Sequence, residues 1–352
     1  MSNRTAIVIL NWNTRDYLEK FIPPLLSSVD GLDAFVAVAD SGSTDGSLEL
    51  LKERFPSVAR IPLGENFGFT GGYNRALREV DADYFVLLNS DVEVPSGWLN
   101  QLIDWMDSHP QCGVCGPKLL SYKNRDNFEY AGAAGGKLDY FGYPYCRGRV
   151  LSHIEKDKGQ YDEPCSVMWV SGAALMVRRS LWEALGGLDD RFFAHMEEID
   201  FCWRAQLAGF SIELVPASKV YHIGGGTLPA TSPDKLYYNY RNNLLLLENN
   251  LAATLRSPVR ARIRIFFRML LDGIAAICYL LTFHPASFKA VLRAHRDYRK
   301  LRKERGVETV TFGEPSTPYL GSTNATGSAV QEAKEVTGFG GLLIFKYICS
   351  IF

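Results

Sequence analysis

The chain has 352 residues, of which 47% are hydrophobic and 22% charged, a composition that excludes a disordered chain and leaves room for one large domain with an appendage. Lys and Arg (38) nearly balance Asp and Glu (39), so the formal net charge is −1. Because there is no overall basic field, nothing in the charge balance predicts nucleic acid as a partner.

The N-terminus and the cysteines indicate a protein of the cytoplasm. The chain runs from Arg4 into a short apolar stretch without the longer apolar region and cleavage site of a secretory signal. Seven cysteines are an odd number and are scattered, which predicts reduced thiols. Cys112 and Cys115 form a CxxC, but no second pair follows at zinc-ligand spacing, so we interpret them as ordinary buried thiols.

Strands and helices are expected to alternate through the first 90 residues. The pattern predicts buried strands that end in polar or acidic residues and amphipathic helices between them. The strands are Thr5–Leu10, Ala34–Ala39, Val58–Leu63 and Tyr84–Leu88, and the helices are Asp16–Val29, Leu48–Phe55 and a segment that follows a glycine-rich stretch and ends at Val80. This order indicates an open, doubly wound, Rossmann-like α/β sheet whose ligand lies beyond the carboxyl ends of the strands.

The character of the chain changes after Asn250. Arg256–Arg268 is both basic and apolar, and Met269–Phe283 is an apolar run of about 15 residues, short of the roughly 20 that span a bilayer. Two interpretations stay open: a helix lying on a membrane surface, or a helix packed on the catalytic domain. We therefore expect a catalytic domain at 1–250, a helical extension at 251–308 and a flexible tail with an apolar C-terminus at 309–352.

The ends of the first two strands carry candidate donor-binding residues. Asn11 and Asn13 follow the first strand, and Asp40, Ser41 and Asp45 follow the second. A carboxylate at a strand end can accept a hydrogen bond from a uracil or thymine N–H or from a ribose. The same residue types are also ordinary turn and helix-cap residues, so each one alone permits a structural interpretation.

A glycine-rich segment from Asn66 to Asn74 also predicts donor contact. Gly68, Gly71 and Gly72 are expected to precede a helix and to let the backbone approach a phosphate at the helix N-terminus. The segment does not match the dinucleotide fingerprint GxGxxG, which argues against a nicotinamide cofactor.

Candidate metal and diphosphate contacts follow two later strands. Asp91 comes directly after Tyr84–Leu88, with Asn89 beside it and Glu93 as a possible second carboxylate, where a divalent cation that bridges two phosphates would be held. His222 precedes a glycine run and is a candidate third ligand, and Arg241 is a cation that could reach a phosphate. Capping by Asp91 and structural roles for His222 and Arg241 are the alternatives.

Three carboxylates stand close together in Glu197, Glu198 and Asp200. Crowded like charges raise at least one pKa, which suits a general base that takes a proton from a sugar hydroxyl. A solvated acidic helix start would have a similar sequence, although the apolar neighbours Phe193 and Phe201 argue against full exposure.

Taken together and in this order, these segments resemble family 2 of the inverting glycosyltransferases with the GT-A fold, and especially its rhamnosyltransferase-like bacterial members. The resemblance covers about Thr5 to Asn250 and also includes Trp169-Val-Ser-Gly172-Ala and Phe-Cys-Trp-Arg204. It implies nucleotide contact at Asp40 and around Asn66–Asn74, metal or diphosphate contact at Asp91 and His222, and a base within the acidic cluster.

The resemblance further implies a single displacement with Mg²⁺ or Mn²⁺, rhamnose from dTDP-rhamnose as donor, and a saccharide acceptor. The basic and apolar C-terminal region predicts that the enzyme works at the inner membrane face on a lipid-linked acceptor. Two residues depart from the family pattern. Asn89 replaces the first Asp of the DxD motif, and Glu198 replaces the Asp of the Glu-Asp base motif, which leaves the base between Glu197 and Glu198. A sugar-phosphate nucleotidyltransferase and a non-catalytic glycan-binding protein are the alternative functions.

Overall fold

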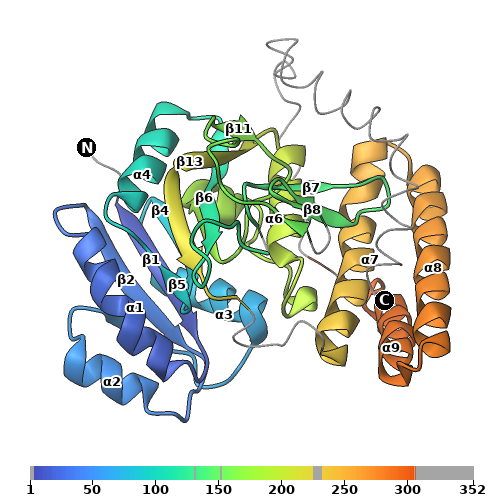
Figure 1. Ribbon diagram of the computed structural model, residues 1–352, viewed down its shortest axis with the longest axis horizontal. Coiled ribbons are helices and arrows are strands. Elements are labelled where there is room, and N and C mark those ends of the chain that lie inside the picture. The colour runs from blue at the N-terminus through green and yellow to red at the C-terminus, as the bar shows by residue number, and fades with distance from the viewer. Residues whose placement is uncertain (1–3, 131, 151–152, 225–231, 305, 307–352) are drawn as a thin grey trace.

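The computed structural model describes residues 4–130, 132–150, 153–224, 232–304 and 306. A large sheet flanked by helices forms one part of the molecule, and three long C-terminal helices form the other (Figure 1). The expected flexible tail at 309–352 lies outside the described residues, as do Gly225 and Gly226 of the glycine run after His222.

The first four long strands are parallel, as predicted, and run in the order β3-β2-β1-β4. In this register Asn11 lies opposite Asp40, and Leu10 lies opposite Asn89. The polar strand ends therefore meet at one edge of the sheet. The elements are β1 (Thr5–Asn11), α1 (Arg15–Ser28), β2 (Ala34–Asp40), α2 (Ser47–Arg54), β3 (Ala59–Pro62), α3 (Gly68–Ala76), a 3₁₀ turn (Leu77–Glu79) and β4 (Tyr84–Asn89).

The sheet continues beyond β4 as a mixed sheet, and within the described residues it has nine strands. β12 (Ala174–Arg178) lies antiparallel between β4 and β6 (Cys112–Ser121), and β13 (Ser211–His222) runs parallel to β6. The short strand β5 (Val92–Glu93) pairs with the end of β13, with Val92 opposite His222. This pairing brings residues from two distant parts of the chain to the same place.

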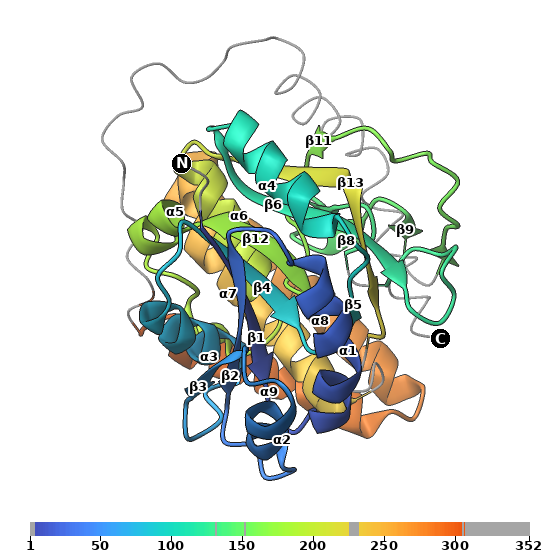
Figure 2. The same cartoon turned by 90° about the vertical axis from the view of Figure 1, so that its left-hand side faces the viewer.

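Alternate residues of the central strand enter two separate cores. Ala6 and Val8 pack with α3, α5 (Arg179–Ala184), α6 (Glu197–Leu207) and α7 (Pro233–Leu255). Ile7 and Ile9 pack on the other face, with α1, α2 and α4 (Trp98–Ser108), as Figure 2 shows. The remaining strands are β11 (Cys165–Ser166) at the sheet edge and a small sheet of β7 (Gly136–Leu138), β8 (Pro144–Cys146), β9 (Arg149–Val150) and β10 (His153–Ile154). A 3₁₀ turn, Asp190–Phe192, leads into the loop before α6.

The glycine segment differs from the sequence-based expectation. Helix α3 begins at Gly68, so Gly71 and Gly72 lie inside the helix and do not precede it. A Cβ on Gly72 would lie 2.6 Å from Cδ1 of Leu10. Glycine is therefore needed at this position because α3 crosses β1 at close range.

Three helices follow the sheet: α7, α8 (Pro258–Leu281) and α9 (Pro285–Leu301). The boundary expected at residue 250 lies inside α7, whose residues Leu244–Leu247 are buried in the main core. α8 packs on α7 and α9. Among the described residues, no helix combines the length and apolar character required to cross a bilayer.

We predict that Gly72→Ala lowers the free energy of unfolding by roughly 1–3 kcal/mol, because the added methyl group overpacks the contact with Leu10. Gly273→Ala is the matched control. It places the same methyl group in helix α8, where nothing lies within 4 Å, and should raise the stability by roughly 0.5–1 kcal/mol through the better helix propensity of alanine. Denaturant titration measures both, and equal effects of the two changes would contradict the close packing of α3 on β1.

Candidate functional site

The ends of β1 and β2 are joined by a buried hydrogen-bond network. Asn11 Nδ2 donates to Asp40 Oδ2 at 2.7 Å, and Asp40 Oδ1 accepts from the backbone N–H groups of Gly42 and Ser43 at 3.1 and 2.9 Å. Asp40 is only 1% exposed. Both of its oxygens thus shape the turn, whereas the buried Ser41 Oγ has no hydrogen-bond partner among the described residues.

Asn13 and Asp45 stabilise the loops around this network. Asn13, with φ of 54°, accepts from the Thr44 N–H at 2.8 Å. Asp45 accepts from the N–H groups of Arg15 and Ser47 at 2.9 and 3.1 Å, which begin α1 and α2. Although burial acts in the opposite direction, a hydrogen bond from the Ser47 hydroxyl and those from the two N–H groups lower the pKa of Asp45. Asp45 therefore remains ionised and ties the two helix starts together.

The first turn of α3 is already bound to protein. The N–H groups of Phe69 and Thr70 donate to the carbonyl oxygen of Phe193 at 2.7 and 3.3 Å, and the Asn66 side chain accepts from the Gly68 N–H at 2.9 Å. These N–H groups are the ones that a phosphate at the helix N-terminus would use. In this arrangement they fix the loop that contains Phe193.

Asn74 makes a second connection to the same region. Its Nδ2 donates to the Leu188 carbonyl and to Asp190, both at 2.7 Å, and its Oδ1 accepts from the Leu188 N–H at 2.9 Å. Gly71 lies on the same helix, where a Cβ would approach Phe67 to 2.9 Å. The residues predicted to bind the donor on α3 thus position the chain before α6 through direct contacts.

Asp91 and His222, which are 131 residues apart in sequence, meet at the end of the sheet. His222 Nε2 lies 3.1 Å from Asp91 Oδ1, and its Nδ1 lies 3.6 Å from Glu129 Oε1. Burial opposes a charge on the imidazole, but the hydrogen bond with Asp91 and the negative charges of Asp91 and Glu129 raise the pKa of His222 to about 10. In the absence of a metal, His222 is therefore a buried cation between two carboxylates. Glu129 was not identified from the sequence, where nothing distinguishes it from other acidic residues.

The donor set at Asp91 is small. The described part of the chain contains no group of three His, Cys, Asp or Glu side chains placed to hold a metal ion. Glu93, considered above as a second carboxylate, forms an ion pair with Arg125 at 2.7 Å. Asp91 and His222 alone fit a cation that takes most of its ligands from phosphate oxygens and water.

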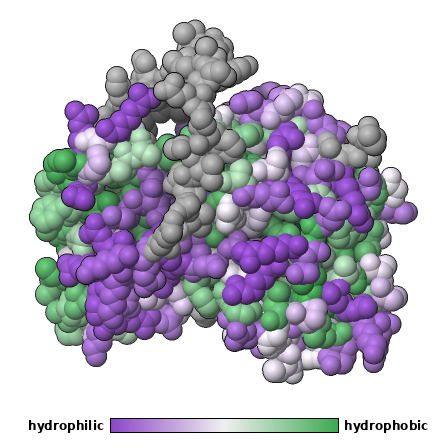
Figure 3. Space-filling model, turned by 180° about the vertical axis from the view of Figure 1, so that it is seen from behind, coloured by the Kyte–Doolittle hydropathy of each residue, from purple (hydrophilic) through white to green (hydrophobic). Residues whose placement is uncertain are grey.

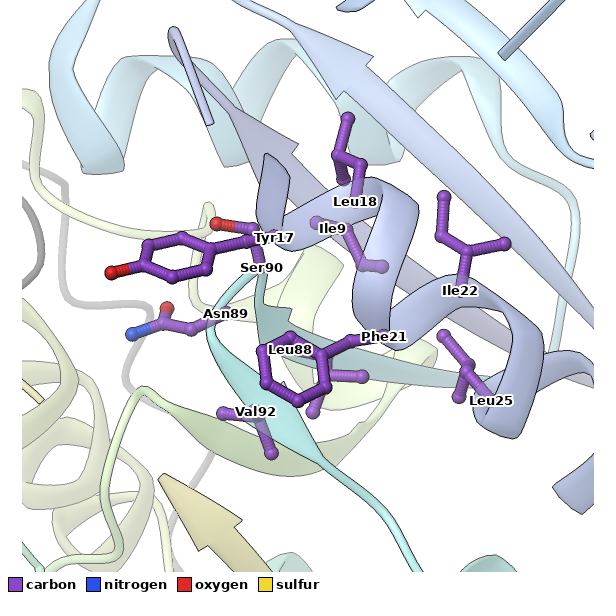
Figure 4. A pocket seen from close by; sticks show the side chains of 10 residues that line it. All are labelled: Ile9, Tyr17, Leu18, Phe21, Ile22, Leu25, Leu88, Asn89, Ser90 and Val92. Atoms are coloured by element: carbon purple, nitrogen blue, oxygen red, sulfur yellow. The ribbon is translucent and has the colours of Figure 1, made fainter. Parts of the chain in front are cut away.

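Asn89 lines a small, largely apolar pocket between α1 and the central strands. Figure 4 shows Asn89 and Tyr17 projecting in the same direction, away from the apolar side chains Leu18 and Ile22 that line the other end. Thr14 connects the two strand ends, since its hydroxyl donates to Asn11 Oδ1 at 2.5 Å and lies 2.9 Å from the Ser90 hydroxyl.

Asp200 is the one member of the acidic cluster whose carboxylate is fully used by the fold. It is 0% exposed, and its Oδ2 accepts from Arg204 at 2.7 Å while its Oδ1 accepts from Asn249 and Asn250 at 3.0 and 2.8 Å. These contacts join α6 to α7. The geometry therefore gives Asp200 a structural connection and no path to a substrate.

Glu197 and Glu198 differ from Asp200 because each has a carboxylate oxygen without a hydrogen-bond donor and a raised pKa. Burial and the neighbouring Glu198 charge raise the pKa of Glu197 well above its ordinary value, and burial raises the pKa of Glu198 to about 7. The Oε2 atom of each is shielded from solvent and finds no hydrogen-bond donor among the described residues. Glu197 is 5% exposed, whereas Glu198 is half-buried and lies beside Gly172. Glu198 is thus the better placed of the two to receive a proton near neutral pH.

The loop before these glutamates has an unusual backbone. Phe193, His195 and Met196 have φ values of 63°, 71° and 75°, a region that residues with a side chain rarely occupy. Such a conformation costs free energy and persists only where surrounding contacts hold it.

Two residues of α7, Arg241 and Asn242, contact this loop. We refer to this pair of residues as the Arg241–Asn242 clamp. Asn242 Nδ2 lies within hydrogen-bond distance of the carbonyl oxygens of Phe192 (3.0 Å), Ala194 (2.7 Å) and His195 (2.7 Å). Arg241 donates to the Phe192 carbonyl at 2.6 Å and is 8% exposed. Sequence analysis singled out Arg241 as a phosphate contact and missed Asn242, because an asparagine in a helix gives no signal of a partner about 50 residues away.

Comparison with known proteins identifies relatives of the whole N-terminal region. The profile of the family described as Glycosyl transferase family 2 matches residues 6–186. The chain is 26% identical, over 282 residues, to the N-acetylglucosaminyl-diphospho-decaprenol L-rhamnosyltransferase of Mycobacterium tuberculosis, covering 75% of this chain and 90% of that protein. It is 25% identical to the dTDP-rhamnosyl transferase RfbF of Shigella flexneri, covering 71% of this chain and 82% of that protein.

Solved structures share the fold at low sequence identity. GalNAc-T7 with UDP, GalNAc and Mn²⁺ aligns with a TM-score of 0.55 at 16% identity, over 70% of this chain and 48% of that one. The mannosyltransferase PcManGT from Pyrobaculum calidifontis, with GDP-Man and Mn²⁺, aligns with a TM-score of 0.52 at 16% identity, over 99% of this chain and 86% of that one. The GT-A fold is thereby confirmed.

We predict that Glu198→Gln and Asp200→Asn change stability in opposite directions. A glutamate whose pKa is raised in the folded state opposes folding once pH exceeds its unfolded value, so removing the charge of Glu198 should stabilise the protein above about pH 7. Asp200→Asn instead leaves Arg204 buried without its counter-ion, which should cost about 3–5 kcal/mol. Urea unfolding of both variants at neutral and alkaline pH checks this, and destabilisation by Glu198→Gln would refute the buried, unpaired state of Glu198.

Proposed function

Because the chain belongs to glycosyl transferase family 2, we propose that it transfers a sugar from a nucleotide-diphospho-sugar to a saccharide acceptor with inversion at the anomeric carbon. The chain is a glycosyltransferase related to rhamnosyltransferases of polysaccharide synthesis. The glutamates at the start of α6 and the Asp91–His222 pair support inverting transfer from a nucleotide-diphospho-sugar.

The observation that carries the proposal is the state of Glu198. Its pKa is about 7, and its Oε2 meets no hydrogen-bond donor in the described structure. A carboxylate with these properties can take the proton of an acceptor hydroxyl as that oxygen attacks the anomeric carbon. Attack from the side opposite the departing diphosphate inverts the configuration. Glu197 is more deeply buried, and burial and the Glu198 charge raise its pKa well above the ordinary value, so we assign Glu198 as the base.

Asp91 and His222 are proposed to hold a divalent cation, Mg²⁺ or Mn²⁺. They offer a carboxylate oxygen and an imidazole nitrogen 3.1 Å apart at the strand ends, and coordination requires that His222 give up its proton. When bound, such a cation neutralises charge on the leaving diphosphate. The Mn²⁺ in the GalNAc-T7 and PcManGT structures supports this assignment.

The donor and acceptor are inferred from the relatives. The Shigella relative is a dTDP-rhamnosyl transferase, and the name of the Mycobacterium relative specifies a decaprenol-linked diphosphate saccharide. We propose dTDP-rhamnose as the donor and a lipid-linked saccharide as the acceptor, used at the cytoplasmic face of the membrane that holds such a lipid. At the nucleotide end, the buried Ser41 Oγ without a partner is a candidate contact beside Asp40.

The alternative functions are less well supported. Family membership favours a glycosyltransferase over a sugar-phosphate nucleotidyltransferase. A non-catalytic glycan-binding protein would have no need for a half-buried glutamate with a pKa near 7 at the start of α6.

We predict that the protein releases dTDP from dTDP-rhamnose in the presence of Mn²⁺ and a polyprenyl-diphosphate saccharide, and that EDTA stops the release. UDP- and GDP-sugars serve as the comparison panel. Asp91→Asn and Glu198→Gln should each lower kcat by about 100-fold or more, because one weakens the cation site and the other removes the base. Ser90→Ala, which removes only the hydroxyl that lies 2.9 Å from the Thr14 hydroxyl, is the control and should retain most activity.

NMR of the product provides the second part of the test. An inverted anomeric configuration supports the single displacement. Retained configuration, or turnover that survives Glu198→Gln, would disprove the assigned mechanism.

A further inference from the structure

Helix α8 carries a stripe of large apolar side chains on its outward face, which a helix on the surface of a water-soluble domain rarely does. Its outward face presents large apolar side chains that are 49–58% exposed: Ile263, Phe266, Phe267, Leu270, Ile274 and Ile277. Their spacing of three and four residues places them in one stripe along the helix. Surface helices of globular proteins normally turn such a stripe toward the core.

The inward face of α8 is largely apolar, with Ile265 and Tyr279 among its buried residues, but it also contains two buried charged side chains. Arg268 and Asp272 are 2% and 0% exposed and form an ion pair at 2.8 Å. Asp272 also accepts from Tyr143 at 3.1 Å and lies 3.3 Å from His295, while Arg268 donates to the Phe141 carbonyl at 3.0 Å. The buried polar network fixes the rotation of α8, so its apolar stripe cannot turn inward without leaving these charges unpaired.

The apolar stripe continues into the turn between α8 and α9. Leu281 and Phe283 there are 71% and 91% exposed. In Figure 3, seen from behind, apolar surface runs along the edge of the molecule on the side where α8 lies, next to strongly hydrophilic surface. A contiguous exposed apolar surface of this kind marks a contact with a partner or a membrane.

The charge around the apolar stripe favours a membrane over a second copy of the chain. From Arg256 to Glu304 the chain has twelve Lys and Arg residues and three Asp and Glu residues, of which Asp272 is buried and paired. Arg260 and Arg262 are exposed at the N-terminal end of α8, beside the stripe. A symmetric contact between two copies would bring like cationic surfaces together, whereas anionic lipid headgroups would neutralise them.

We propose that the outward face of α8, with the Leu281–Phe283 turn, lies in the headgroup region of an anionic bilayer. The helix lies on the membrane and does not span it, in agreement with the absence of a spanning helix among the described residues. The inference deepens the proposed function and rests on it, because a lipid-linked acceptor is the reason for such a contact. α8 packs directly on α7, the helix that carries the Arg241–Asn242 clamp, so the membrane surface and the catalytic loop are connected through one helix.

Flotation of the full-length protein with vesicles tests the proposal. Vesicles of phosphatidylcholine alone and with phosphatidylglycerol are the probes, and the triple variant Phe267→Glu, Ile274→Glu, Phe283→Ser removes apolar exposure without touching a buried contact. We expect the wild type to float with the anionic vesicles and to lose part of this binding at high salt. The triple variant should bind more than about tenfold more weakly. Leu207→Glu, which introduces the same apolar-to-acidic change at an exposed residue of α6, should bind like the wild type.

The wild type failing to float, or the triple variant floating equally well, would overturn the proposal. Sedimentation equilibrium of both proteins tests the main alternative, a contact between two copies of the chain. If the wild type self-associates but does not bind vesicles, and the triple variant does not self-associate, the stripe is a dimer contact. Release of nucleoside diphosphate without vesicles is measured in parallel. A wild type that floats but shows no turnover would contradict the proposed function and still support the membrane contact. Turnover without flotation would support the proposed function and contradict the membrane contact.

Discussion

The structure of the site depends on the Arg241–Asn242 clamp. Three carbonyl oxygens of the loop before α6 lie within 3.0 Å of one side-chain amide of α7, and the loop holds three non-glycine residues at positive φ. The Phe193 carbonyl in this loop also binds the first turn of α3. This one loop therefore contacts α3 and leads into α6, so it positions Glu197 and Glu198 at the start of α6. Its strain is a cost that the contacts from α7 and α3 offset.

This arrangement separates three acidic residues that look equivalent in sequence. Asp200 has an arginine and two asparagines as partners, whereas neither Glu197 nor Glu198 has a donor for its Oε2 atom in the described structure. Unpaired burial raises the pKa of Glu197 well above its ordinary value, with a further contribution from the Glu198 charge, and brings the pKa of Glu198 near neutrality. Glu198 gains a pKa suited to a base at the expense of stability, a trade that is common where a fold supports chemistry. Because α7 packs on α8, the helix that holds the catalytic loop also contacts the helix that we propose lies on the membrane.

The sequence predicts the parts that follow from local pattern. Apolar β-branched runs that end in polar residues predicted β1, β2 and β4, and a parallel register then places Asn11, Asp40 and Asn89 at one edge. Gly72 was expected before a helix and lies within it, because its role is set by Leu10 on a neighbouring strand. The partners of Asn74 and Asp200 lie 114 and 50 residues away, beyond any local signal. In α8 the apolar stripe is visible in the sequence, but its outward direction depends on the buried contact of Asp272 with Tyr143.

The pH dependence of kcat/KM in the wild type and in Asn242→Ala tests most directly whether the clamp creates the base. The account predicts that wild-type kcat/KM rises with pH through a pKa of about 7, the value of Glu198 held in its buried position. Loss of the amide of Asn242 should admit water to the loop and move this rise toward the ordinary pKa of a glutamate, with a lower kcat. A wild-type profile without a rise near neutral pH, or an unchanged rise in Asn242→Ala, would contradict it.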